Sequence, residues 1–212
     1  MQLLRTAVLT AAMSFSVSAL AQSPTLLDVQ HTWAAINYQT DDADQQLTQF
    51  ESLVENAREL VSASPDDAAA LTWLGISQAS AARAKGGLGA LDYAEDAKEN
   101  FEKAIAIDPA VLDGAALFSL GALYHKVPGW PVSFGDDDEA ESLFKRALKV
   151  SPEGMDANYF YAEFLVDEGE YSRAYDYLTK AQQAPPRTER PLADKGRRQA
   201  IDALLKEIKE KR

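Results

Sequence analysis

The sequence contains no cysteine and only two histidines among its 212 residues. Without a thiol, the chain has no disulfide bond, no cysteine nucleophile, no thiolate metal site and no lipid anchor on an N-terminal cysteine. Neither His31 nor His125 belongs to a cluster of metal-type ligands at helical spacing, so each is expected to be a packed or surface side chain. The sequence therefore predicts no metal and no cofactor.

Motifs that carry catalysis are also missing. No serine elbow of the G-x-S-x-G type occurs. The glycine-rich segment 84–89 lacks the residue order of a phosphate-binding loop, and the acidic run 136–139 lacks the alternating spacing of a calcium loop. A turn and the start of a helix are the simpler interpretations. We predict that the protein is not an enzyme and has no catalytic residues.

Positive charge is scarce, because 21 Lys and Arg face 33 Asp and Glu and the net charge is -12. Binding to phosphates depends on clustered Lys and Arg, so nucleic acid and an anionic membrane surface are unfavourable partners. After the first 21 residues, no run is apolar over the roughly 20 residues that span a bilayer. We therefore expect no membrane anchor.

The first 21 residues have the order of a secretory signal peptide. Arg5 precedes an uncharged stretch over 6–20, and Ala19 and Ala21 are the small residues that a signal peptidase reads. A membrane-anchoring helix is the alternative, but this apolar run is shorter than the roughly 20 residues needed. We expect cleavage before Gln22 and a periplasmic or secreted protein.

The rest of the chain is built from repeats. An alanine is followed by a large apolar residue four positions later, a second alanine after three more and a proline after five more. The three copies are Ala97, Phe101, Ala104, Pro109; Ala140, Phe144, Ala147, Pro152; and Ala174, Leu178, Ala181, Pro186. This spacing puts the apolar residues on one helix face, while the alanines let a neighbouring helix approach and the proline ends the helix.

A partner helix precedes each copy, marked by a large residue beside a glycine or alanine at 74–75, 120–121 and 161–162. This arrangement resembles the tetratricopeptide repeat and implies an all-α helical-hairpin solenoid that binds other molecules. We expect about ten helices, no sheet and one domain over 22–212. The expected elements are helices at 26–38 and 43–63, hairpins at about 66–109, 110–152 and 153–186, and a capping helix at about 191–210.

Two of the hairpins carry insertions. The first and second have about ten and seven more residues between their helices than the family spacing requires. The two insertions are expected to emerge side by side at one edge of the stack, next to His125. The second contains Trp130 and Phe134, and either both rings seal the end of the solenoid or they form the wall of a binding site.

In the tetratricopeptide family, four recurring positions of each first helix line the concave face. Here they are Ala69, Thr72, Ile76, Ala79; Ala115, Phe118, Ala122, His125; and Asp156, Tyr159, Glu163, Val166. They lack the Lys, Arg and Asn with which other members clamp a peptide carboxylate, so we expect an apolar groove or packing against the N-terminal helices. The predicted binding residues are Phe118, Tyr124, His125, Trp130, Phe134 and Tyr159.

Three segments resemble a narrower family, the T component found with periplasmic TRAP transporters. They are 84–91 (AKGGLGAL), 121–135 (GALYHKVPGWPVSFG) and 158–164 (NYFYAEF). The resemblance implies an exported scaffold that associates with the substrate-binding subunit of a solute uptake system, as an oligomer with apolar channels. The chain departs from the lipoproteins of that family because it has no cysteine to acylate.

Three functions follow from these observations. The first is an exported scaffold that binds a protein partner, for which a periplasmic substrate-binding protein is one candidate and a further copy of the chain another. The second is a carrier of a small apolar ligand held in the concave groove. The third, a hydrolase, is disfavoured because no set of His, Asp and Ser converges in the sequence.

Overall fold

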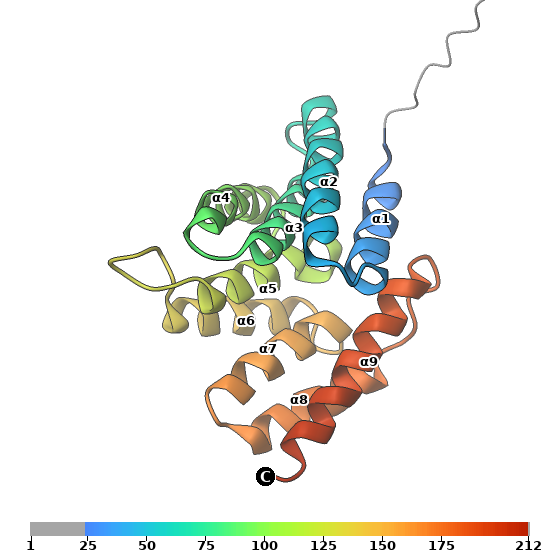
Figure 1. Ribbon diagram of the computed structural model, residues 1–212. Helices are drawn as coiled ribbons and strands as arrows, with labels where there is room; N and C mark the ends of the chain where they lie inside the picture. Colours follow the sequence, from blue (N-terminus) through green and yellow to red (C-terminus); the bar gives the residue numbers. More distant parts are fainter. Residues whose placement is uncertain (1–23, 212) are drawn as a thin grey trace, which may run out of the picture.

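The computed structural model describes residues 24–211, so the predicted signal peptide (1–21) lies outside the described part. Within residues 24–211 the chain forms nine α-helices, one 3-10 turn and no strand, which confirms the all-α prediction (Figure 1). None of the helices described is both long and apolar enough to cross a membrane. The helices are α1 (Leu26–Gln39), α2 (Ala43–Ala63), α3 (Ala68–Lys85), α4 (Leu91–Ile107), α5 (Val111–Lys126), α6 (Asp137–Val150), α7 (Met155–Asp167), α8 (Tyr171–Gln183) and α9 (Pro191–Ile208).

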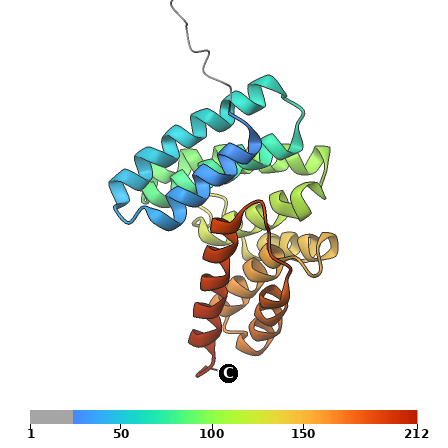
Figure 2. The same cartoon turned by 90° about the vertical axis from the view of Figure 1, so that its right-hand side faces the viewer.

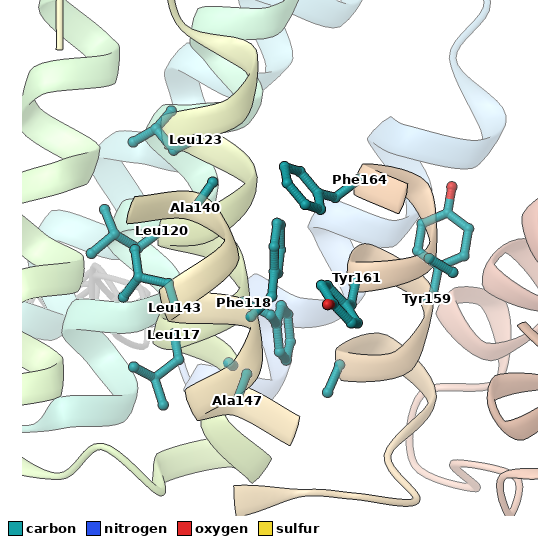
Figure 3. Packing of buried hydrophobic residues seen from close by; sticks show 14 of the residues in the cluster. Leu117, Phe118, Leu120, Leu123, Ala140, Leu143, Ala147, Tyr159, Tyr161 and Phe164 are labelled. Atoms are coloured by element: carbon teal, nitrogen blue, oxygen red, sulfur yellow. The ribbon is translucent and has the colours of Figure 1, made fainter. Parts of the chain in front are cut away.

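Consecutive helices form hairpins, α3 with α4, α5 with α6 and α7 with α8 (Figure 1). All six alanines of the recurring pattern are fully buried. A Cβ atom on Gly75 would lie 2.7 Å from the ring of Phe101, and one on Gly121 would lie 3.0 Å from the ring of Phe144. A side chain at Gly75 would force the Phe101 ring to move, and one at Gly121 would be closer than an ordinary contact, so the close approach predicted from the small residues is confirmed. Figure 3 shows Ala140 and Ala147 of α6 among the leucines of α5.

Aspartates begin three of the helices. The side chains of Asp42, Asp67 and Asp136 each accept a hydrogen bond from a backbone N–H in the first turn of α2, α3 and α6. The acidic run 136–139 therefore starts α6, where its negative charges also interact favourably with the helix dipole.

The start of α5 has an unusual backbone. Leu112, Asp113 and Gly114 have φ angles of 50°, 59° and 78°, all in the left-handed region. Residues other than glycine adopt this conformation at a cost of roughly 1–2 kcal/mol each. Gly114 packs on α6, because a Cβ atom there would lie 3.4 Å from Val150. Tertiary packing thus holds a strained turn at the first residues of α5.

The two ends of the helical array meet. Besides packing on α7 and α8, α9 contacts α1 through its first turns, so helices from both ends of the chain meet (Figures 1 and 2). Nε2 of His31 donates to the backbone oxygen of Glu189 at 2.6 Å. A Cβ atom on Gly196 would lie 2.4 Å from the ring of Tyr38, so α9 and α1 approach closely. The predicted capping helix therefore also joins the last hairpin to the first helix.

The two insertions take different forms. The first mainly lengthens α3 and α4, and only residues 86–90 connect them, so the expectation of two inserted loops is wrong for this one. The second forms a loop over 127–136 in which the backbone N–H of Gly135 donates to the oxygen of Pro128 at 3.0 Å. A Cβ atom on Gly135 would lie 1.9 Å from the carbonyl oxygen of Val127, so only glycine fits there.

Candidate functional site

The concave face holds a cavity of about 950 Å³. Helices α3, α5 and α7 form its floor, and α1 and the first turns of α9 form its outer walls. Its main lining side chains are Leu26, Gln30, Trp33, Trp73, Ile76, Phe118, Asp156, Phe160, Arg187, Arg190 and Arg197. The cavity therefore exists only because the two ends of the chain meet. Its size suits a small molecule or a few residues of a peptide.

Aromatic rings form one wall of the cavity. Trp33 and Trp73 meet edge to face with their ring centroids 6.0 Å apart, and Phe118 stacks on Phe160 at 5.2 Å. The indole Nε1 of Trp33 donates to the hydroxyl of Ser80 at 2.8 Å. The indole N–H of Trp73 is buried and has no hydrogen-bond partner among residues 24–211. Such a wall offers a large apolar surface with an unpaired donor inside it.

Partly buried ion pairs adjoin this wall. Asp156 accepts hydrogen bonds from Nη1 of Arg187 and, at 2.8 Å, from Nε of Arg197. Asp194 accepts from Nε of Arg187 at 3.3 Å and from Nε of Arg198 at 2.8 Å. Burial acts to raise the pKa of Asp156, but the positive charges of Arg197 and Arg187 outweigh it and lower that pKa below its ordinary value of 3.8. Three arginines thus bind the carboxylates of Asp156 and Asp194.

Two arginines lie against aromatic rings of the cavity. Cζ of Arg197 is 4.2 Å from the ring centroid of Tyr159 and 4.6 Å from that of Phe160. Cζ of Arg190 is 5.7 Å from the ring of Trp73. Burial lowers the pKa of Arg190, yet an arginine stays charged at neutral pH. The cavity is therefore aromatic and locally cationic in a chain whose net charge is -12.

The structure divides the six predicted binding residues between two places. Phe118 lines the cavity, and Tyr159 lies next to it against Arg197. The other four lie at the opposite end of the second hairpin, where α5 ends and α6 begins: Tyr124, His125, Trp130 and Phe134. We call this second place, residues 124–137, the insertion edge. None of its residues lines the cavity.

The two aromatic rings of the inserted loop differ in burial. Phe134 packs edge to face on Tyr124 with centroids 5.4 Å apart, and Nζ of Lys98 lies 5.5 Å from its ring. Trp130 instead is 90% exposed. Phe134 therefore covers the end of the hairpin, whereas Trp130 does not, so the alternative in which both rings seal the solenoid is wrong for Trp130.

His125 ties three helices together at the insertion edge. Its Nδ1 lies 2.6 Å from Oδ1 of Asp137, and its Nε2 lies 2.9 Å from Oδ2 of Asp167, which Lys126 also contacts at 2.6 Å. Burial acts to raise the pKa of Asp167, but hydrogen bonds from Lys126 and His125 lower it below 3.8. No group of three or more His, Asp and Glu within residues 24–211 is arranged to hold a metal ion.

Sequence reasoning missed the arginines and tryptophans of the cavity. It assigned the concave lining to the repeat positions alone, and those positions do lack Lys and Arg. The positive charge comes instead from α9 and the segment before it, so the groove is aromatic and apolar on one side and cationic on the other. The available signal was the gathering of four arginines within residues 187–198 of an acidic chain.

Comparisons with known proteins agree with this architecture. Residues 132–193 match the family model described as tetratricopeptide repeat. The chain is similar to a tetratricopeptide-repeat protein of Thermus thermophilus, with 18% identity and a TM-score of 0.56 over 84% of this chain and 98% of that one. A structure of MamA has 20% identity and a TM-score of 0.45 over 81% of this chain and 95% of that one. No curated protein matches the sequence. The chain folds as a tetratricopeptide-type helical-hairpin solenoid.

Proposed function

We propose that the protein is a non-enzymatic scaffold that holds an extended segment of a partner protein in its concave cavity. The tetratricopeptide-type fold suggests a protein-interaction scaffold. The observation that supports the cavity as the binding site is its construction: both ends of the chain close over the concave face and leave about 950 Å³ between aromatic rings and fixed arginines.

A peptide matches this mixed lining. The rings of Trp33, Trp73 and Phe118 offer contact area to apolar side chains, and guanidinium groups donate hydrogen bonds to carbonyl or carboxylate oxygens. The ion pairs around Asp156 fix Arg187 and Arg197 before a partner arrives, which reduces the entropy lost on binding.

Site-specific crosslinking tests this proposal. A photoreactive amino acid at Ser119, which lines the cavity, is expected to capture one defined segment of a partner, identified by mass spectrometry of the crosslinked peptide. The matched position is the exposed Lys145 of α6, outside the cavity, where no such capture is expected. Equal capture of the same segment from both positions would contradict binding in the cavity.

The partner class that the T-component resemblance suggests is the substrate-binding subunit of a TRAP-type uptake system. Co-purification of the two proteins, and its loss when the cavity is blocked by Ser119→Trp, would support this assignment. Unchanged co-purification with the folded Ser119→Trp protein would place such a partner elsewhere on the surface.

The signal-peptide pattern of residues 1–21 supports export to the periplasm. Deletion of residues 2–21 is expected to retain the protein in the cytoplasm, while the full-length chain is recovered from the periplasm in a shorter form. Recovery of the full-length chain from the cytoplasm without shortening would contradict export.

The second candidate function is a carrier of a small apolar ligand, and the observation that favours it is the aromatic wall of the cavity. Native mass spectrometry of the purified protein would show a bound molecule of defined mass. A Phe118→Asp variant, which places a charge in this wall, should lose that molecule. A spectrum of the wild-type protein without any bound mass would favour the scaffold function.

A further inference from the structure

We propose that Arg190 and Trp73 form a hydrogen-bond donor site for a carboxylate, so that the partner segment carries one carboxylate next to an apolar side chain. This inference rests on the proposed peptide-binding function and specifies the chemistry of the peptide.

Arg190 has no directly bound anionic partner among residues 24–211. The neighbouring Arg187, Arg197 and Arg198 are bound by Asp156 and Asp194. The guanidinium of Arg190, in contrast, makes no hydrogen bond or ion pair within the described part of the chain and lies over the face of the Trp73 ring. It is half-buried in the cavity lining. The carboxylates of Asp156 and Asp113 act on Arg190 only at longer range, without a direct ion pair. Its partly desolvated positive charge therefore has no bound counterion, and an anion that binds it directly is stabilised there.

Trp73 adds a donor at the same place. Its side chain is 4% exposed and lines the cavity, and its indole N–H has no acceptor among the described residues. A carboxylate has two oxygens and about four acceptor positions. It can therefore accept from the guanidinium and, once the incoming segment exposes the covered indole N–H, from the indole as well. A guanidinium and a carboxylate also match as two parallel hydrogen bonds, which favours a carboxylate over a single carbonyl oxygen.

The cavity side chains around Arg190 determine which partner residue can lie beside the bound carboxylate. The rings of Trp33, Phe118 and Phe160 and the side chain of Ile76 line the same cavity and suit an apolar or aromatic side chain. The net charge of -12 repels a run of acidic residues at longer range. The segment is therefore expected to carry a single carboxylate, either an Asp or Glu side chain or the C-terminus of the partner.

This site differs from a carboxylate clamp built on repeat positions. Arg190 precedes α9, and Trp73 is not among the four recurring concave positions of α3. The positively charged side of the site thus depends on α9 lying against the concave face.

Calorimetric titration with three heptapeptides tests the proposal. The first has blocked ends and a phenylalanine followed by a glutamate, the second has glutamine in place of that glutamate, and the third is the glutamine peptide with a free C-terminal carboxylate. The first peptide is expected to bind about 10-fold more tightly than the second, as for a hydrogen bond to a charged group. Tight binding of the third instead would identify the C-terminus as the source of the carboxylate.

Variants locate the effect. Arg190→Gln should abolish the preference for the charged peptide, and Arg190→Lys, which keeps the charge but not the planar fork, should retain part of it. Trp73→Phe, which keeps a ring but removes the donor, should lower the preference about threefold. The matched control is Arg146→Gln, which removes one positive charge from the exposed surface of α6 and should leave the preference intact. Circular dichroism checks that each variant is folded.

Equal affinities for all three peptides would overturn the carboxylate site but not the peptide groove. Equal losses from Arg190→Gln and Arg146→Gln would also overturn it, because the effect would then come from net charge. No binding of any peptide to the folded wild-type protein would overturn both proposals. Decanoate binding more tightly than every peptide would assign the site to a small carboxylate and overturn the peptide assignment.

Discussion

The cavity and the insertion edge hold their carboxylates in different ways. At the cavity, the side chain of Asp156 is 20% exposed and is paired with Arg187 and Arg197, which come from the far end of the chain. At the insertion edge, the side chain of Asp167 is 45% exposed and is paired with His125 and Lys126 of a neighbouring hairpin. The first cluster fastens α9 and the segment before it to α7, whereas the second fastens adjacent helices at the surface.

This difference shows where binding chemistry arises in a solenoid of this kind. The insertion edge presents one exposed ring, Trp130, on a loop fixed by its own backbone hydrogen bonds. The cavity instead combines charge, aromatic rings and an unpaired donor from five helices. The cavity is therefore the place where a change of a single side chain should affect both stability and binding.

The largest expected effect comes from removing one carboxylate at each place. Asp156→Ala should lower the free energy of unfolding by about 3 kcal/mol, because it leaves the largely buried Arg197 without a counterion and removes one of the two carboxylates that bind Arg187. Asp167→Ala should cost less than about 1 kcal/mol, because Lys126 is exposed to water and His125 keeps its contact with Asp137. Urea denaturation of both variants measures the contrast. Equal losses would show that the two clusters contribute alike.

Overpacking at the cavity side of the second hairpin should have the next largest effect. Ala147 is fully buried, and its Cα lies 3.7 Å from the position of a Cβ atom on Gly114 in the strained turn of α5. Ala147→Phe should destabilise the fold by about 2 kcal/mol. Arg146→Phe, one residue away on the exposed side of α6, should change the urea midpoint little. If Ala147→Phe left the midpoint unchanged, the close packing of α5 on α6 would be refuted.

Low pH should also reveal a difference between Asp156 and Asp167 in their contributions to stability. The pKa values of Asp156 and Asp167 are both lowered in the folded protein, so each stabilises the fold above its ordinary pKa of 3.8 and loses that contribution as the pH falls through the lower folded value. Urea denaturation measures how much unfolding free energy the protein loses between about pH 7 and about pH 3. This loss should be reduced more by Asp156→Asn than by Asp167→Asn. A larger reduction for Asp167→Asn would reverse the comparison.

The smallest expected effect concerns the exposed ring. Trp130→Ala should change the free energy of unfolding by less than about 0.5 kcal/mol, because the side chain makes little contact with the folded chain. Phe134→Ala, which removes the ring packed on Tyr124, should cost more. Thermal melting of both variants checks this order. A large loss from Trp130→Ala alone would mean that the loop packs differently in solution.

The fold was predictable because its signals are local. The pattern of Ala97, Phe101 and Ala104 places side chains on one helix face through their spacing alone, and Gly75 marks the crossing that Phe101 occupies. The cavity gave no such signal, since Trp33 and Arg190 come to line the same cavity only after the small rotations between successive hairpins have added up to a curve. Spacing in the sequence does not record that curvature.

The insertion edge was partly predictable. Trp130 and Phe134 stand out in the sequence because they share one loop rich in glycine and proline. Which ring is covered depends on Tyr124 and Lys98, and the contact with Lys98 comes from the preceding hairpin. A local pattern therefore located the aromatic loop but did not predict its packing.

The contact between α1 and α9 also bears on how the molecule comes apart. In an open array of repeats, a terminal unit has a neighbour on one side only, so unfolding begins by fraying at either end. Here each terminal helix has a second neighbour at the opposite end of the chain, and loosening either one breaks the same interface. Partial opening then removes contacts from both termini at once, which makes unfolding more cooperative and gives amide hydrogens of α1 and α9 similar protection against exchange with solvent.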